Sequence, residues 1–226
     1  MVAAKRTPFG TFGGSLKGHS PVDLQVLASN AAMESVGLKP EQVDSVCIGN
    51  VLSASSPDAP YLARHVALRC GMPVPTPAYV GKETPQPTVT HLSYSSVNRL
   101  CGSGFQSIVN GVQEILVGDS QIVMTGGTDN MSASPYAVRD IRFGTRLGVD
   151  PKLEDMMWTS LTDQLSKTPM GVTAENLAAK YDVTREDSDN FSLRSVSSHS
   201  AAEGLIVSLQ IPADLGSCRP GRTLQG

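Results

Sequence analysis

The amino-acid sequence predicts an α/β fold, in which helices cover a mainly parallel β-sheet. Residues 46–52 and 121–127 are short runs rich in apolar residues, and each run is typical of a buried strand. Between them, apolar residues recur at helical spacing from 105 to 116, in a segment with a single charge at Glu114. Strand, helix and strand in this order form the repeating unit of an α/β sheet.

The composition is that of an ordinary globular protein. The 226 residues suffice for one large or two small cores, and 40% hydrophobic with 17% charged residues excludes a disordered chain. The formal net charge of −3 argues against a nucleic-acid-binding protein, which normally carries a basic surface. Four cysteines are too few for a disulfide framework and suit a reducing compartment. No apolar run is long enough to span a bilayer, and we expect no signal peptide.

The first predicted helix begins after Ser20. Ser20 suits the N-cap, Pro21 the first turn and Asp23 the acidic position of a capping box. Apolar residues then recur on one face, and Gly37 is expected to end the helix. Residues 2–16 carry no such pattern and, taken alone, indicate a flexible glycine-rich leader.

A second helix is predicted over residues 61–70, with Gly71 as its stop. A surface or packing role is expected for His65 in this helix, and Cys47 is expected in the core because it lies within the strand at 46–52. Residues 72–96 are rich in proline, which excludes a helix there.

Cys101 is the candidate nucleophile of this chain. It opens a glycine-rich turn that leads into the apolar helix, and a helix N-terminus favours the thiolate form of a cysteine. Gly102 and Gly104 allow a close approach of backbone and ligand. The near absence of charge from 101 to 118 predicts a helix that is buried on most sides. The alternative is that Cys101 is a small buried hydrophobe without chemistry.

Four stretches of the chain resemble the thiolase family. The string N-R-L-C-G-S-G-F-Q-S-I at 98–108 is similar to the family's nucleophile segment, and residues 2–16 are similar to its N-terminus. The string G-G-T-D-N-M-S at 126–132 resembles the family's G-G-x-E-x-M-S, with Asp129 in place of the glutamate. The string M-G-V-T-A-E-N at 170–176 resembles the family's loop domain. This likeness covers residues 2 to about 191, roughly half of a complete member.

The resemblance implies a thiolase-like fold and a division of the chain. A complete member has five layers in the order αβαβα, of which this chain holds the N-terminal half while the C-terminal half is missing. Residues 1–132 would form the N-terminal α/β half, and residues 133–191 would form part of the loop domain that covers coenzyme A. Residues 79–96 have no family counterpart and are expected to loop out of the sheet as an insertion. Residues 192–226 diverge from the family and are expected to be a poorly ordered tail.

The same resemblance implies an acyltransferase of fatty acid β-oxidation. Thiolases cleave a 3-ketoacyl-CoA into acetyl-CoA and a shortened acyl-CoA through a cysteine thioester, so Cys101 would be the catalytic nucleophile. Coenzyme A would be a substrate, with no bound cofactor and no metal, and the sequence assigns no residues to its binding. The expected partners are the acyl-CoA or CoA substrate and further copies of the chain in a dimer or tetramer, without nucleic acid or a membrane span. The expected location is the mitochondrion, with the cytoplasm as the alternative.

The other catalytic groups of the family have no match in the chain. The family's histidine lies in G-H-P, its second cysteine in C-x-G-G and an asparagine in N-E-A-F, and none of these strings occurs here. We therefore expect no activity from this chain alone. We also expect an exposed apolar face on the helix after Cys101, since the missing half would cover it. Two alternatives remain: a non-catalytic thiolase product that is unstable or pairs with complete subunits, and a cysteine hydrolase supported by Cys101 alone.

Overall fold

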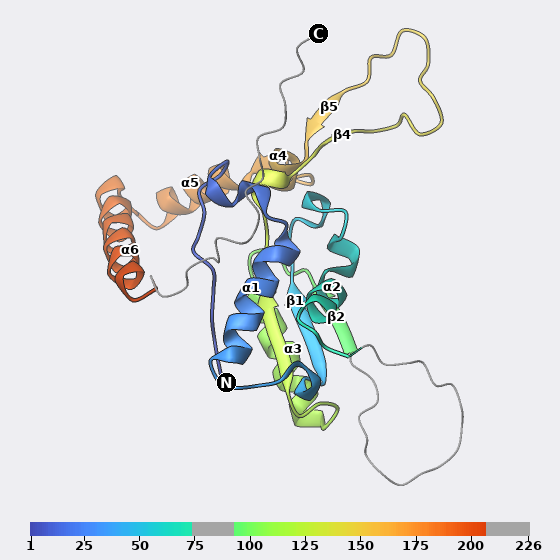
Figure 1. Ribbon diagram of the computed structural model, residues 1–226. Coiled ribbons are helices and arrows are strands. Elements are labelled where there is room, and N and C mark those ends of the chain that lie inside the picture. The colour runs from blue at the N-terminus through green and yellow to red at the C-terminus, as the bar shows by residue number, and fades with distance from the viewer. Residues whose placement is uncertain (74–92, 207–226) are drawn as a thin grey trace, which may run out of the picture. The chain divides into compact units, whose positions relative to one another are not determined.

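The computed structural model describes residues 1–73 and 93–206 (Figure 1). The chain divides into two compact units, residues 1–161 and residues from 162 onward. This division differs in place from the expected boundary between 132 and 133. The assignment of residues 1–132 and 133–191 to family domains stays a prediction.

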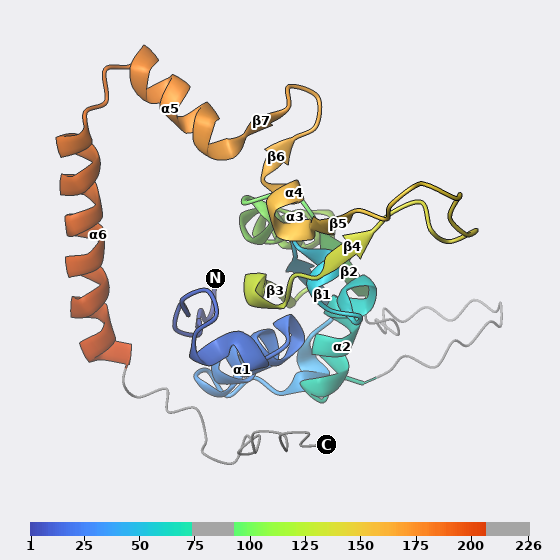
Figure 2. The same ribbon diagram turned by 90° about the horizontal axis from the view of Figure 1, so that it is seen from above.

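The first unit is built on a parallel three-stranded sheet, which confirms the predicted α/β fold. The strand order is β2 (Ser93–Val97), β1 (Ser45–Gly49) and β3 (Val123–Gly127), and Gly49 lies opposite Val97 and Gly127. Helices α1 (Pro21–Glu34) and α2 (Leu62–Arg69) pack on one face, and α3 (Ser103–Val117) packs on the other (Figure 2). The sheet is therefore the middle of three layers.

The predicted capping box starts α1. The backbone N–H of Asp23 donates to Ser20 Oγ at 3.1 Å, and the backbone N–H of Ser20 donates to Asp23 Oδ2 at 2.8 Å. The predicted end of the next helix is also confirmed, since α2 stops before Gly71, which has a φ of +83°. Local signals therefore suffice for these helix boundaries.

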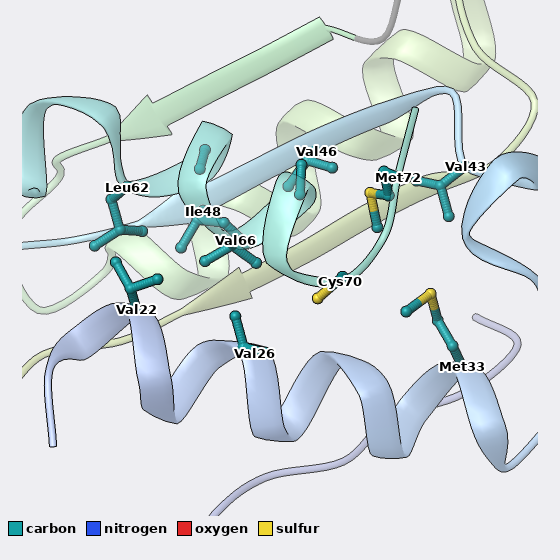
Figure 3. Packing of buried hydrophobic residues seen from close by; sticks show 12 residues of the cluster. Val22, Val26, Met33, Val43, Val46, Ile48, Leu62, Val66, Cys70 and Met72 are labelled. Atoms are coloured by element: carbon teal, nitrogen blue, oxygen red, sulfur yellow. The ribbon is translucent and has the colours of Figure 1, made fainter. Parts of the chain in front are cut away.

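The core of the first unit lies between the sheet and the pair α1 and α2 (Figure 3). Side chains from β1, α1 and α2 interdigitate there, among them Val46, Ile48, Val22, Leu62 and Val66. Cys47 is fully buried as predicted, on the opposite side of β1, where Asn110 of α3 donates to its sulfur at 3.8 Å. Both faces of β1 are covered, as expected of a central parallel strand.

Shorter elements complete the first unit. Single 3₁₀ turns occur at Ser15–Gly18, Pro40–Gln42, Ser53–Ser55, Ala59–Tyr61 and Met131–Ala133. An antiparallel pair of β4 (Tyr136–Val138) and β5 (Leu153–Asp155) leads into α4 (Met156–Ser160). His65 of α2 stacks on Tyr61 and lies 3.5 Å from Asp58, in agreement with its expected packing role.

The second unit holds two short strands and two helices. Strands β6 (Thr162–Asp163) and β7 (Thr168–Pro169) pair in antiparallel fashion, and α5 (Met170–Lys180) and α6 (Arg185–Ile206) follow. Within the described part of the chain, no helix combines the length and hydropathy needed to cross a bilayer.

Three sequence expectations are wrong in part. Residues 93–96 do not loop out, because Ser93–Val97 form β2 and pair with β1; residues 79–92 lie outside the described residues. Residues 192–206 are helical and belong to α6, while residues 207–226 lie outside the description. Helix α3 is not buried on most sides, since only Ser103, Ser107 and Gly111 are buried in it. The predicted exposed apolar face of this helix is confirmed: Phe105 and Leu116 are 72% and 78% exposed.

Candidate active site

Cys101 lies at the carboxyl edge of the parallel sheet. It stands between the end of β2 at Val97 and the start of α3 at Ser103, beside the ends of β1 and β3. Cys101 is exposed, whereas Cys47 and Cys70 are buried. Ligands of open α/β sheets bind at this edge, so Cys101 lies at the edge where such sheets bind ligands.

A left-handed residue directly precedes Cys101. Leu100 has a φ of +52°, which costs a residue other than glycine about 1–2 kcal/mol. Its N–H donates to Asn98 Oδ1 at 3.0 Å, and its carbonyl accepts from the backbone N–H of Ser103 at 2.9 Å. Ser103 Oγ also donates to this carbonyl at 2.5 Å and accepts from the N–H of Arg99 at 2.8 Å. The surrounding bonds thus hold a strained turn in one conformation.

Small residues bring α3 into close contact with the sheet. A Cβ on Gly127 would stand 2.9 Å from the Cα of Gly104, and a Cβ on Gly111 would stand 2.6 Å from Cγ2 of Thr125. Ser107 Oγ donates to the carbonyl of Gly126 at 2.8 Å. The amino end of α3 therefore lies directly against the carboxyl ends of β1 and β3, which fixes the height of Cys101 above the sheet.

Asp129 joins the loops that follow β1 and β3. Its Oδ1 accepts from the backbone N–H of Val51 at 3.0 Å and of Leu52 at 2.8 Å, and from Asn50 Nδ2 at 2.9 Å. Burial raises the pKa of Asp129, and the N–H groups of Leu52 and Val51 offset part of that rise. Sequence reasoning noted Asp129 as a departure from the family string and missed this role. The signal that could have revealed it is an acid two residues after the glycine pair that ends a predicted strand.

Neither of the two histidines whose side chains are described, His19 and His65, is hydrogen-bonded to Cys101. His65 instead contacts Tyr61 and Asp58. His91 lies outside the described residues, and the side chain of His199 is likewise not described. Among the described residues there is no group of three His, Cys, Asp or Glu side chains that could hold a metal ion. A hollow formed by residues between 139 and 154 is lined by Arg139, Arg146 and Lys152, among others, and Cys101 is not one of its lining residues. The described site is therefore an exposed thiol to which no described histidine is hydrogen-bonded.

Comparison with known families identifies the fold around this thiol. A model of the thiolase N-terminal domain matches residues 1–205. The chain belongs to the thiolase family. The match extends beyond residue 191, where the resemblance visible in the sequence weakens.

Relatives of known sequence support this membership in the thiolases. The chain is 54% identical over 195 residues to the mitochondrial 3-ketoacyl-CoA thiolase of Mus musculus, covering 86% of this chain and 45% of that protein. The human mitochondrial 3-ketoacyl-CoA thiolase is 53% identical over the same length. A probable acetyl-CoA acyltransferase of Staphylococcus aureus (strain COL) is 38% identical, with the same coverage.

Solved thiolase structures show the same fold. Human mitochondrial 3-ketoacyl-CoA thiolase in complex with CoA matches with a TM-score of 0.78 and 51% identity, over 90% of this chain and 48% of that chain. The acetyl-CoA acetyltransferase of Bacillus anthracis matches with a TM-score of 0.74 and 36% identity, over 92% and 47% of the two chains. This chain thus spans about half the length of the thiolases that it matches.

Proposed function

We propose that this chain is the nucleophile-bearing half of a thiolase that cleaves 3-ketoacyl-CoA to acetyl-CoA and a shortened acyl-CoA. The observation that carries the proposal is the placement of Cys101. It is exposed, stands at the amino end of α3 and at the carboxyl edge of the sheet, and lies inside the segment that matches the thiolase N-terminal domain.

The reaction runs as acyl transfer through a thioester. The thiolate of Cys101 attacks the keto carbon of the substrate, and the bond between C2 and C3 breaks. The shortened acyl group stays on sulfur, and the electron pair leaves on the acetyl-CoA carbanion, which takes up a proton. The thiol of a second coenzyme A then attacks the thioester, passes its proton to a base and frees Cys101. Backbone N–H groups at the start of α3, including that of Cys101, are suited to the oxyanion that forms at each attack.

Coenzyme A is the expected substrate, and no other cofactor is required by this chemistry. A relative that is 51% identical has been solved with CoA, which supports its binding by this chain as well. The relatives at 53–54% identity are mitochondrial by name, so we place this protein in the mitochondrion. We further propose that it forms a dimer or tetramer with copies of itself or with complete subunits.

A second candidate function is a non-catalytic thiolase product that acts by pairing with complete subunits. The apolar face of α3 favours this candidate, because Phe105, Val112 and Leu116 are exposed on it. The lack of a described histidine beside Cys101 favours it too, because the thiolate needs a base and the carbanion needs an acid. Groups that act as a catalytic unit are strongly non-additive, so one remaining member retains little of the rate.

Two measurements on the purified chain test these proposals. Brief iodoacetamide treatment at neutral pH, followed by peptide mapping, should label Cys101 ahead of Cys47 and Cys70. Preferential labelling of either buried cysteine would contradict the nucleophile assignment. Cys218 lies outside the described residues, so the pH dependence of its labelling is measured and compared with that of Cys101.

The second measurement is cleavage of acetoacetyl-CoA with free coenzyme A, with Cys101→Ala as the control. We expect no turnover by the chain alone. Robust turnover that is lost in Cys101→Ala would refute the non-catalytic candidate and would show that a group of this chain supplies the base.

A further inference from the structure

Two aspartates clamp the sheet at opposite ends in the same way. At the amino end, Asp44 Oδ2 accepts from the backbone N–H groups of Gln121 and Ile122, both at 2.9 Å, and so ties the start of β1 to the start of β3. At the carboxyl end, Asp129 ties the loop after β3 to Val51 and Leu52 after β1. Only the Asp129 clamp lies at the carboxyl end of the strands, which is also the end at which Cys101 lies.

The Asp129 clamp continues toward Cys101 through Val51, Asn98 and Leu100. The carbonyl of Val51, whose N–H is held by Asp129, accepts from Asn98 Nδ2 at 3.1 Å. Asn98 Oδ1 in turn accepts from the N–H of Leu100 at 3.0 Å. Leu100 is the residue with left-handed backbone conformation that directly precedes Cys101. One chain of hydrogen bonds thus runs from Asp129 through Val51 and Asn98 to Leu100, in the turn that precedes Cys101. We call this chain the Asp129 relay.

We propose that Asp129 is a positioning residue for Cys101, acting through Val51 and Asn98 on the strained turn at Leu100. The carboxylate sets the place of the Val51 peptide, and the Asn98 amide transfers that placement to Leu100. The turn then holds the sulfur at the amino end of α3, where backbone N–H groups favour the thiolate.

The carboxylate of Asp129 is suited to this role because both of its oxygens accept hydrogen bonds and neither donates one. Three N–H groups, from Asn50, Val51 and Leu52, converge on it, and a carboxylate can accept all of them. The N–H of Val51 lies 3.0 Å from Oδ1 and 3.2 Å from Oδ2, so it is shared between both carboxylate oxygens. An amide at the same place sets its N–H₂ group against this N–H in place of Oδ2, which weakens the bond from which the relay starts. Asp129 is partly buried, so water compensates for the weakened bond only in part.

The test compares alkylation rates of Cys101 in the full chain. Iodoacetamide is added at neutral pH to wild type, Asp129→Asn, Asp129→Glu, Asn98→Ala and the double variant Asp129→Asn with Asn98→Ala. Asp44→Asn is the matched control, since it breaks the equivalent clamp at the other end of the same strands. Urea unfolding of each variant is measured in parallel, so that local and global effects separate.

We expect Asp129→Asn and Asn98→Ala each to slow the alkylation of Cys101 by roughly two- to tenfold, the scale of one net hydrogen bond. The double variant should be no slower than either single one, because both break the same relay. Asp129→Glu keeps the carboxylate and should recover part of the rate. Asp44→Asn should lower the free energy of unfolding about as much as Asp129→Asn does, but it should leave the alkylation rate of Cys101 unchanged.

A rate for Asp129→Asn equal to wild type, or an equal slowing by Asp44→Asn, would overturn the proposal. If Asp129→Asn fails to fold, Asn98→Ala decides the matter, because Asn98 is exposed and an unchanged rate in that variant excludes the relay. The inference rests on the proposed function in taking Cys101 as the nucleophile. Its readout is thiol alkylation, so it can fail while the acyltransferase proposal stands, and the reverse holds too.

Discussion

Gly49 and Ser103 lie so close that a Cβ on Gly49 would stand 2.4 Å from the carbonyl carbon of Ser103. Gly49 is the last residue of the central strand, and Ser103 is the first residue of α3. A side chain at Gly49 would therefore push α3 away from the sheet. Since Cys101 stands just before Ser103, this contact also sets the distance between the thiol and the sheet edge.

The first prediction concerns this contact. Gly49→Ala should lower the free energy of unfolding by about 1–3 kcal/mol, because the methyl group meets backbone atoms that cannot rotate away. Urea unfolding measures the change. Gly18→Ala is the control, since a Cβ at Gly18 has nothing within 4 Å, and it should leave stability nearly unchanged. Equal stability of Gly49→Ala and wild type would show that α3 does not rest on β1 as described.

The second prediction concerns the apolar face of α3. Phe105 and Leu116 are 72% and 78% exposed, so their replacement by glutamine removes little buried area. The double variant Phe105→Gln with Leu116→Gln should keep its free energy of unfolding to within about 0.5 kcal/mol of wild type. Its self-association, followed by sedimentation velocity, should begin at a higher protein concentration. A large loss of stability instead would mean that these side chains are packed.

The third prediction concerns alkaline pH. Burial raises the pKa of Cys70 from 9.0 to about 11, although Arg69 and Ser29 counteract part of it. The folded state then keeps the proton where the unfolded chain releases it. The stabilisation is complete below pH 9.0 and is lost toward pH 11, by about 1.4 kcal/mol for each pH unit.

Cys70→Ala is the variant that isolates this effect. Its free energy of unfolding starts lower because of the lost packing, but it should fall less steeply than wild type across the same alkaline range. Urea unfolding at a series of pH values provides both curves. Parallel curves would show that Cys70 does not titrate with folding.

The fourth prediction concerns acidic pH. Burial alone would raise the pKa of Asp23, but hydrogen bonds from Ser20 and the guanidinium of Arg69 at 2.7 Å outweigh it and hold the pKa below 3.8. The stabilisation from this carboxylate is therefore present above pH 3.8 and is lost as the pH falls through the folded-state pKa. Asp23→Asn should flatten the acid limb of the stability curve, measured by urea unfolding. Acid limbs of equal slope in Asp23→Asn and wild type would show that Asp23 does not titrate with folding.

Features set by neighbouring residues could be predicted from the sequence. The capping box joins Ser20 to Asp23, three positions further along the chain, and the stop at Gly71 depends on one backbone conformation. The placement of Cys101 in a turn before an apolar helix follows from a short pattern as well, and its role as the nucleophile stays a prediction. Such features depend only on steric contacts and hydrogen bonds between residues that are close in sequence, so they can be predicted without knowledge of the tertiary structure.

The faces of α3 and the role of Asp129 were decided only by tertiary structure. Helical periodicity marks an apolar face but does not say whether it meets the sheet, and here the small residues Ser103, Ser107 and Gly111 meet it instead. They do so because close packing on Gly49 and Gly127 leaves no room for larger side chains. Asp129 reaches Val51 across 78 positions of sequence, and β2 joins the sheet through its parallel pairing with β1. These are contacts between distant segments, and their free energy depends on the packed sheet rather than on any local pattern.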